Sequence, residues 1–374
     1  MINKDRLLQL FYDLLNINSP SLKEREIADF VIEKLKNLGL EVTEDNVGSK
    51  IGGNTGNIFA FLPSNTQNGK SIFLGAHLDT VEPTSNLNIV TKDGVISSDG
   101  TSILGADDKA GLAVIIEAVE SIIENNIPHS DIQLVFNVAE EIGLCGSKNM
   151  NKENLNADLG YIFDTQKPAG GITVSAPSHE NLFIEIKGKA AHAGMAPESG
   201  ISAILAASNA ISKMKLGRID SETTANVGVI EGGKARNIVP DLVKIKAEAR
   251  SRNQDKLIAQ SKHMKEIFES EASAIGAEAK VEIIREYDSY RWSENDDVIK
   301  LAVSACKKCN IEPHFMDGGG GSDANNFNSY GVPCVVIGLG YDNAHSSSEN
   351  IAIDDLVKSC EYAHALILSA VEGI

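Results

Sequence analysis

Apolar residues follow different periods in different parts of the chain. They recur every three or four positions between residues 7 and 15 and again between 27 and 38, which predicts two amphipathic helices. A longer helical pattern covers residues 111–124. Four short apolar runs predict buried strands: residues 57–62, 71–76, 132–138 and 159–163. Because buried strands alternate with helices, we expect an α/β fold with helices on both faces of a sheet.

The pattern changes after residue 180. Between 180 and 291, segments with strand and helix character follow the order strand, helix, strand, strand, helix, strand. This order predicts a compact α+β domain with its helices on one face of a sheet. The α/β pattern returns from residue 292. We therefore predict a discontinuous domain of residues 1–179 and 292–374, into which residues 180–291 are inserted as a second domain.

Composition narrows the range of functions. The 374 residues include 34 Lys and Arg against 52 Asp and Glu, a net charge of −18, so a basic face for nucleic acid is not expected. No apolar stretch is long enough to cross a membrane, and the N-terminal residues lack a signal-peptide core. The five cysteines are an odd number, which argues against a disulfide framework. We expect a cytoplasmic protein that binds neither nucleic acid nor membrane.

Acidic and histidine side chains gather just after predicted strands. Five such positions occur: His77 with Asp79, Asp107 with Asp108, Glu140 with Glu141, Asp164, and His345. In an open α/β sheet the carboxyl ends of the strands share one edge, so these distant residues can converge. Each pair alone also fits a solvated strand end or a helix start, but five together predict a metal site.

The spacing within these clusters suggests separate roles. His77 and Asp79 are two apart on a strand and can face one site, with His77 as a ligand and Asp79 holding the imidazole. Adjacent side chains diverge, so Glu141 can bind metal while Glu140 faces the substrate as a general base. We interpret Asp107 as a bridge between two cations.

These residues match the motifs of a known family. The segments His-Leu-Asp-Thr at 77–80, Gly-Ala-Asp-Asp-Lys-Ala-Gly at 105–111, the Glu140–Glu141 pair, Asp164 and Ala-His-Ser at 344–346 resemble those of the dizinc exopeptidases. That family includes peptidase T, glutamate carboxypeptidase, acetylornithine deacetylase and succinyl-diaminopimelate desuccinylase. The resemblance covers nearly the whole chain and is strongest to peptidase T-like enzymes.

The resemblance implies a fold and a metal centre. The fold would be a zinc-exopeptidase-like catalytic domain, with a mixed sheet and flanking helices, plus an inserted ferredoxin-like lid and dimerisation domain. One metal would be bound by His77 and Asp164 and another by Glu141 and His345, with Asp107 bridging them through a cis peptide bond to Asp108. Both ions would be Zn²⁺, with Mn²⁺ or Co²⁺ as alternatives, and they would activate a water molecule for which Glu140 is the base.

Five further residues are candidates for substrate binding. In dimers of the family, a histidine similar to His192 reaches the partner's active site and donates to the oxyanion. Asn237 and Arg250 resemble substrate-binding positions, since a guanidinium can pair with a peptide carboxylate. The backbone N–H groups of Gly319 and Gly320, before a predicted helix, are suited to hold substrate oxygens. Each of these residues also fits an ordinary exposed loop position.

We expect an aminopeptidase that acts on short peptides, similar to a tripeptidase, and that forms a homodimer through the inserted domain. Within the family, Asp at the position of Asp164 accompanies the aminopeptidase and dipeptidase branch. The segment between Asp79 and Asp107 lacks the long insertion of peptidase T, which leaves selectivity for tripeptides open. The alternatives are an acyl-amino-acid deacylase or carboxypeptidase of the same family, and a relative that binds metal or a partner without catalysis.

Overall fold

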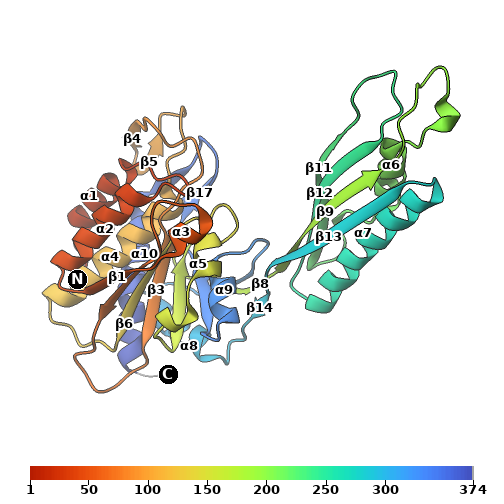
Figure 1. The fold of residues 1–374 in the computed structure, drawn as a ribbon. Helices are drawn as coiled ribbons and strands as arrows, with labels where there is room; N and C mark the ends of the chain where they lie inside the picture. Colours follow the sequence, from red (N-terminus) through yellow and green to blue (C-terminus); the bar gives the residue numbers. More distant parts are fainter. Residues whose placement is uncertain (373–374) are drawn as a thin grey trace. The chain divides into compact units, whose positions relative to one another are not determined.

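The structure, a computed structural model, describes residues 1–372 and divides them into two compact units (Figure 1). The first unit contains Met1–Ser175, Trp292–Gly318 and the described residues from Ser322 onward. The second contains Ala176–Arg291 and Gly319–Gly321. The predicted insertion spans residues 180–291. The second unit also takes in the start of strand β9 (Ser178–Lys187), because that strand pairs along its whole length with its neighbours.

A mixed sheet forms the centre of the first unit. Its order is β1-β2-β6-β3-β7-β16-β8-β14, and β15 pairs with β8. The strands are β1 (Glu41–Glu44), β2 (Ile58–Leu62), β6 (Ile132–Asn137), β3 (Ile72–His77), β7 (Leu159–Phe163), β16 (Cys334–Ile337), β8 (Gly171–Ala176), β14 (Tyr290–Arg291) and β15 (His314–Asp317). The four strands expected in the first part of the chain are confirmed as β2, β3, β6 and β7.

The middle strands of this sheet are parallel and buried. Strand β3 pairs in parallel with β6 and β7, and β7 pairs in parallel with β16. All residues of β3 are buried. Close packing depends on Gly160 of β7, since a Cβ there would lie 2.1 Å from the ring of Phe73. That ring makes an edge contact with Phe327, with centroids 5.0 Å apart.

Helices flank this sheet. They are α1 (Lys4–Leu15), α2 (Arg25–Asn37), α3 (Val47–Ile51), α4 (Ala106–Glu124), α5 (Cys145–Asn149), α8 (Asp297–Lys308), α9 (Asp323–Ser329) and α10 (Ile353–Glu372), with a 3₁₀ turn at Lys152–Asn154. Helix α4 packs against β3 and α10, whereas α9 packs against β7 and β16. A small antiparallel sheet joins β17 (Tyr341–Asp342), β18 (Asn350–Ala352), β5 (Val95–Ser98) and β4 (Ile89–Lys92) in that order.

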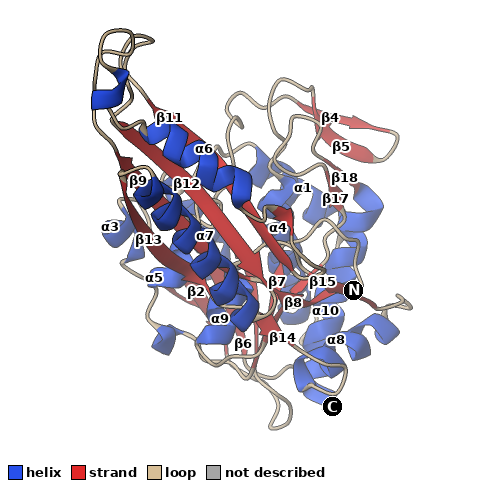
Figure 2. Ribbon diagram, turned by 90° about the vertical axis from the view of Figure 1, so that its right-hand side faces the viewer, coloured by secondary structure: helices blue, strands red, loops and turns tan. Residues whose placement is uncertain are grey.

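The second unit has a ferredoxin-like arrangement. In chain order it contains β9, a 3₁₀ turn at Pro197–Ser199, α6 (Ala203–Lys213), β10 (Gly217–Arg218), β11 (Thr223–Gly232), β12 (Leu242–Ser251), α7 (Gln254–Ala274) and β13 (Glu278–Tyr287). The sheet order is β10-β11-β12-β9-β13, and all pairs are antiparallel. Helices α6 and α7 lie on the same face of this sheet (Figure 2). Their apolar side chains bury a core that includes Met264 and Phe268.

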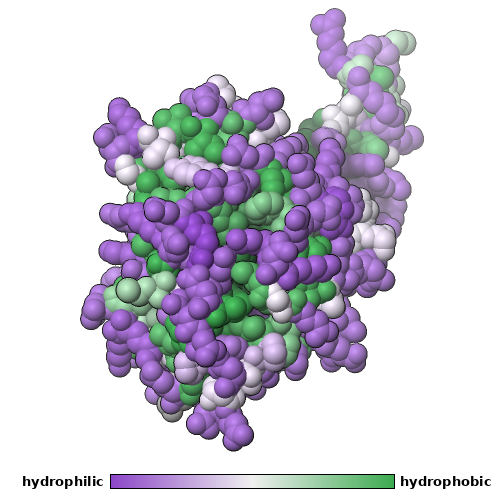
Figure 3. All heavy atoms as spheres, turned by 90° about the vertical axis from the view of Figure 1, so that its left-hand side faces the viewer, coloured by the Kyte–Doolittle hydropathy of each residue, from purple (hydrophilic) through white to green (hydrophobic). Residues whose placement is uncertain are grey.

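Charged and polar side chains cover most of the face drawn in Figure 3, with apolar patches between them. None of the helices within residues 1–372 combines the length and the hydropathy that a membrane span requires.

Candidate metal centre

Three parallel strands bring acidic and histidine residues to one edge of the central sheet. His77 is the last residue of β3, the Glu140–Glu141 pair follows β6, and Asp164 follows β7. Neighbouring parallel strands end at the same edge, so these side chains meet although their segments are far apart in sequence. Asp107 lies in the first turn of α4, and His345 lies in the loop between β17 and β18.

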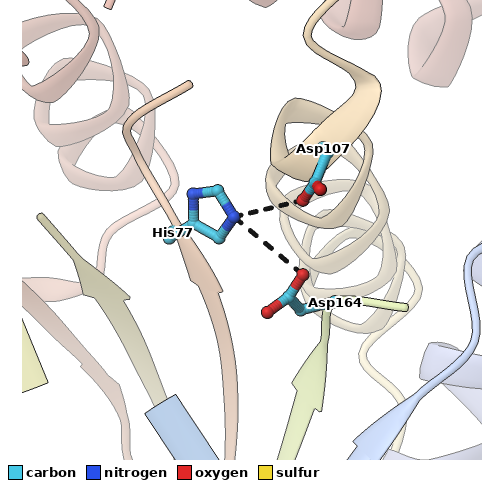
Figure 4. Close-up of side chains that lie close together, drawn as sticks. All are labelled: His77, Asp107 and Asp164. Carbon is cyan, nitrogen blue, oxygen red and sulfur yellow. Dashed lines mark hydrogen bonds and ion pairs between the residues drawn. The ribbon is translucent and has the colours of Figure 1, made fainter. Parts of the chain in front are cut away.

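A first group of ligand atoms surrounds His77. Its Nε2 lies 3.2 Å from Asp107 Oδ1 and 3.9 Å from Asp164 Oδ1 (Figure 4). One ligand atom from each residue lies within 4.8 Å of the others. The three side chains point toward one another from a strand end, a helix start and a second strand end, as three ligands of one ion would.

A second group shares Asp107 with the first. His345 Nε2 lies 3.3 Å from Asp107 Oδ2 and 3.1 Å from Glu141 Oε1. One ligand atom from each of these three residues lies within 4.8 Å of the others. The two oxygens of Asp107 therefore face different histidines. The assignment of these residues to two metal ions stays a prediction. The Asp107–Asp108 peptide bond is cis.

Asp79 lies beneath this edge and holds the main chain. Its Oδ1 accepts the N–H of Glu140 at 2.9 Å, and its Oδ2 accepts the N–H of Glu141 at 3.2 Å and the hydroxyl of Ser21 at 2.6 Å. The nearest partner of His77 Nδ1 is the Asp79 main-chain oxygen at 2.7 Å, and the Asp79 carboxylate is 3.5 Å away. The Asp79 carboxylate thus orients the turn that carries Glu140 and Glu141 and also contacts the His77 ring. Its predicted role of holding the imidazole stays a prediction.

The electrostatics of the centre are those of an anionic cluster. Burial and the nearby charge of Asp107 raise the pKa of Asp164, and burial and the charge of Asp164 raise the pKa of Glu140. Hydrogen bonds to Asp107 and Glu141 raise the pKa of His345 to about 10. Burial opposes the ionisation of Asp107, but its hydrogen bonds with His345 and His77 outweigh burial and lower its pKa. The His345 imidazole, Asp164 and Glu140 thus all bind a proton more readily than usual, as expected beside an excess of negative charge.

The donor set fits divalent cations. Two of the three groups of ligand atoms share Asp107, and the third joins His77 with Glu140 and Glu141. Nitrogen and oxygen donors of this kind suit Zn²⁺, Mn²⁺ or Co²⁺. Buried carboxylates in such close contact require a compensating positive charge, which metal ions would supply. The residues present therefore fit a two-metal centre.

The comparison with known sequences agrees with this geometry. The profile of Peptidase family M20/M25/M40 matches residues 73–369. The chain belongs to this family. The family is metal-dependent, and the two groups of ligand atoms lie within the matched segment.

Several relatives of this M20 chain match it over almost its entire length. The YqjE protein of Bacillus subtilis (strain 168) is 42% identical over 370 residues, which cover 99% of this chain and 100% of that protein. The aminopeptidase PepT of Bacillus cereus ATCC 10987 has a solved structure that is 42% identical, with a TM-score of 0.93 and 99% of each chain covered. A tripeptidase structure from Staphylococcus aureus subsp. aureus Mu50 is 40% identical, with a TM-score of 0.96 and the same coverage. The resemblance to peptidase T-like enzymes and the predicted fold class are confirmed.

The M20 chain carries its predicted substrate-binding residues in the second unit. His192 and Asn237 are exposed and lie on adjacent loops, since the Asn237 main-chain oxygen accepts the N–H of Ala193 at 2.9 Å. Arg250 lies beside Gly320, and a Cβ on that glycine would be 3.9 Å from Arg250 Nη1. Gly319 has open space around it. The five residues thus form two groups within this unit: His192 with Asn237, and Arg250 with Gly319 and Gly320.

The Arg250 side chain is held by an acid of its own strand. Its Nε and Nη2 donate to the two oxygens of Glu248 at 3.2 and 3.0 Å. Glu248 also lies 3.2 Å from His179 Nε2. The hydrogen bond with His179 and the bonds with Arg250 lower the pKa of Glu248 to about 2, so the acid stays ionised and fixes the guanidinium. Sequence analysis did not single out Glu248 or His179, although Glu248 lies between two alanines on its strand.

Two other buried acids near the M20 centre have main-chain contacts that were not identified from the sequence. Asp108 accepts the N–H of His77 at 3.1 Å and that of Gly111 at 3.2 Å. Glu24 accepts the N–H of Ala139, directly before Glu140, at 3.0 Å. Their partners are main-chain groups, which no spacing rule reveals. For Asp108 the one usable signal was its place beside Asp107 in a segment of small residues, and Glu24, which lies among charged residues, gave none.

Proposed function

We propose that this M20 protein is an aminopeptidase that uses two Zn²⁺ ions to remove N-terminal residues from short peptides, as a tripeptidase-like enzyme. The proposal rests on one observation: two groups of ligand atoms share Asp107, and Glu140 lies directly beside the ligand Glu141. The solved relatives at 40% and 42% identity, described as a tripeptidase and an aminopeptidase, support the choice of substrate. The five free cysteines support a cytoplasmic location.

The residues of the chain have separate tasks in this proposal. His77, Asp164, Glu141 and His345 would hold the ions, and Asp107 would bridge them. Bound divalent ions supply Lewis acidity, which polarises the scissile carbonyl and lowers the pKa of water.

Glu140 accepts the proton of the attacking water and passes it to the leaving amine nitrogen. The hydrogen bond from its N–H to Asp79 fixes the main chain from which its carboxylate projects.

A tripeptide with three different residues tests this activity. We expect the zinc-loaded protein to release alanine first from Ala-Gly-Phe, and to act at least ~10²-fold more slowly on the N-acetylated tripeptide, because the proposed site takes peptides with a free amino end. The products are identified by amino-acid analysis over time. Release of phenylalanine first would indicate a carboxypeptidase, and faster cleavage of N-acetyl amino acids would indicate a deacylase. Either result would refute the proposal.

The variant Glu140→Gln tests the general base. We expect kcat to fall by at least ~10²-fold, the usual contribution of a general base, while the protein retains two metal ions per chain. Glu153→Gln, a change at an exposed acid in the 3₁₀ turn after α5, is the matched control and should leave kcat unchanged. Normal turnover of Glu140→Gln with full metal content would show that another group serves as the base.

We also propose that the protein is a homodimer through the second unit, in which His192 donates to the oxyanion in the partner's site. Exposed apolar side chains on one helix and one strand support this surface: Leu205 of α6 is 51% exposed and Ile230 of β11 is 50% exposed. Within the described chain, the pairing of β10 with β11 extends only over Ala225 and Thr224. The remaining edge of β11 is open to strand pairing.

Sedimentation analysis of Leu205→Asp tests the dimer. We expect a dimer for the unchanged protein, and for this variant a monomer with at least ~10-fold lower kcat, because His192 would then have no partner site. Ile258→Asp, at an apolar residue of α7 that is 48% exposed, is the control and should remain dimeric. A fully active monomer would exclude the proposed role of His192.

A further inference from the structure

Glu349 is a fully buried acid four residues after His345, and neither the metal groups nor the proposed chemistry uses it. Its side chain has 0% exposure. Its Oε2 accepts the N–H of Gly105 at 2.5 Å, and its Oε1 accepts the N–H of Asp107 at 3.1 Å. Each carboxylate oxygen thus satisfies one main-chain donor of the segment that carries the shared ligand.

These two donors belong to the start of α4. The first N–H groups of a helix have no partner within the helix, and a negative charge is favourable there. Gly105, the residue before α4, has a φ of 81° and provides no side-chain cap. A carboxylate from a distant segment takes that place. Buried Lys109 lies nearby and donates from its Nζ to the Ile17 carbonyl at 2.5 Å.

The main chain of Glu349 is fixed in turn. Its N–H donates to the Ser346 carbonyl at 3.0 Å, which closes a turn directly after His345. The next residue begins β18, and Ile351 of that strand pairs with Ile96 of β5. The carboxylate therefore connects the loop of His345 to the helix start of Asp107, and these are the two segments whose side chains meet at 3.3 Å.

We propose that Glu349 is a positioning residue of the two-metal centre: it holds the Asp107 segment and the His345 loop in the one arrangement in which both oxygens of Asp107 can be shared. This inference rests on the proposed two-metal function. Glu349 itself touches neither the ions nor the substrate. Its effect is on the geometry of Asp107, since partners behind the ligands set their orientation and affect metal affinity by about 10–100-fold.

The variant Glu349→Gln removes one of the two acceptors and keeps the shape of the side chain. An amide has a single acceptor oxygen, so one buried N–H would face an NH₂ group. The matched control is Glu117→Gln, because Glu117 is also 0% exposed and accepts a main-chain N–H, that of Asn3 at 2.7 Å. Metal-free proteins are titrated with Zn²⁺ against a competing chelator, and their thermal unfolding is recorded without metal.

We expect both variants to unfold at a lower temperature, and only Glu349→Gln to bind Zn²⁺ more weakly, by about 10–100-fold for at least one ion. Zinc affinities equal to those of the unchanged protein would overturn the inference and leave Glu349 a structural residue. If Glu349→Gln does not fold, Glu349→Asp replaces it. That variant retains the charge but is one methylene shorter, and an unchanged zinc affinity would again overturn the inference. Fewer than two bound Zn²⁺ in the unchanged protein would instead refute the proposed function.

Discussion

The carboxylate of Asp107 lies between two histidines that are far apart in the sequence. Its oxygens are 3.2 Å from His77 Nε2 and 3.3 Å from His345 Nε2. Asp164 and Glu141 complete the two groups. Three carboxylates cannot remain ionised so close together, and largely removed from water, without compensating positive charge. In the metal-free chain the imidazoles provide part of it, as the raised pKa of His345 shows. Two divalent cations would compensate the negative charge of the carboxylates more completely.

Two classes of acid build the centre. Asp107, Glu141 and Asp164 face the ligand groups. Asp79, Asp108, Glu24 and Glu349 instead accept main-chain N–H groups of the turns that carry the ligands and Glu140. The acids of the second class accept hydrogen bonds from backbone donors that would otherwise lack partners, and they thereby fix the main chain at this edge of the sheet. The metal chemistry that we propose therefore depends on acids that never reach the metal.

Hydrophobic periodicity was sufficient for the large elements. The expected strands and long helices, including β9, β11, β12, β13, α6 and α7 of the second unit, all form. Strand β8 was missed, because its sequence Gly-Ile-Thr-Val-Ser-Ala is mixed in polarity. The small sheet of β4, β5, β17 and β18 was missed as well, since two- to four-residue strands have no detectable period. Gly319–Gly321 could not be assigned to the second unit from sequence, because only contacts in space place them there.

The candidate ligands could be found from the sequence because unusual residue types follow buried strands, and parallel strand ends must meet. The hydrogen bonds that hold the main chain of these ligands in place could not be found from the sequence. Asp79 holds the N–H groups of Glu140 and Glu141 in addition to its contact with His77. Glu349 accepts the N–H of Asp107, more than two hundred residues away. Such contacts join a side chain to a main chain, which every residue has, so no residue pattern marks them.

Anomalous X-ray diffraction from zinc-loaded crystals, recorded at the zinc absorption edge, is the most direct test of a metal pair that shares Asp107. The account predicts two peaks, one beside His77 and Asp164 and the other beside Glu141 and His345, with the Asp107 carboxylate between them. No peak at saturating zinc, a single peak, or peaks away from these side chains would contradict it.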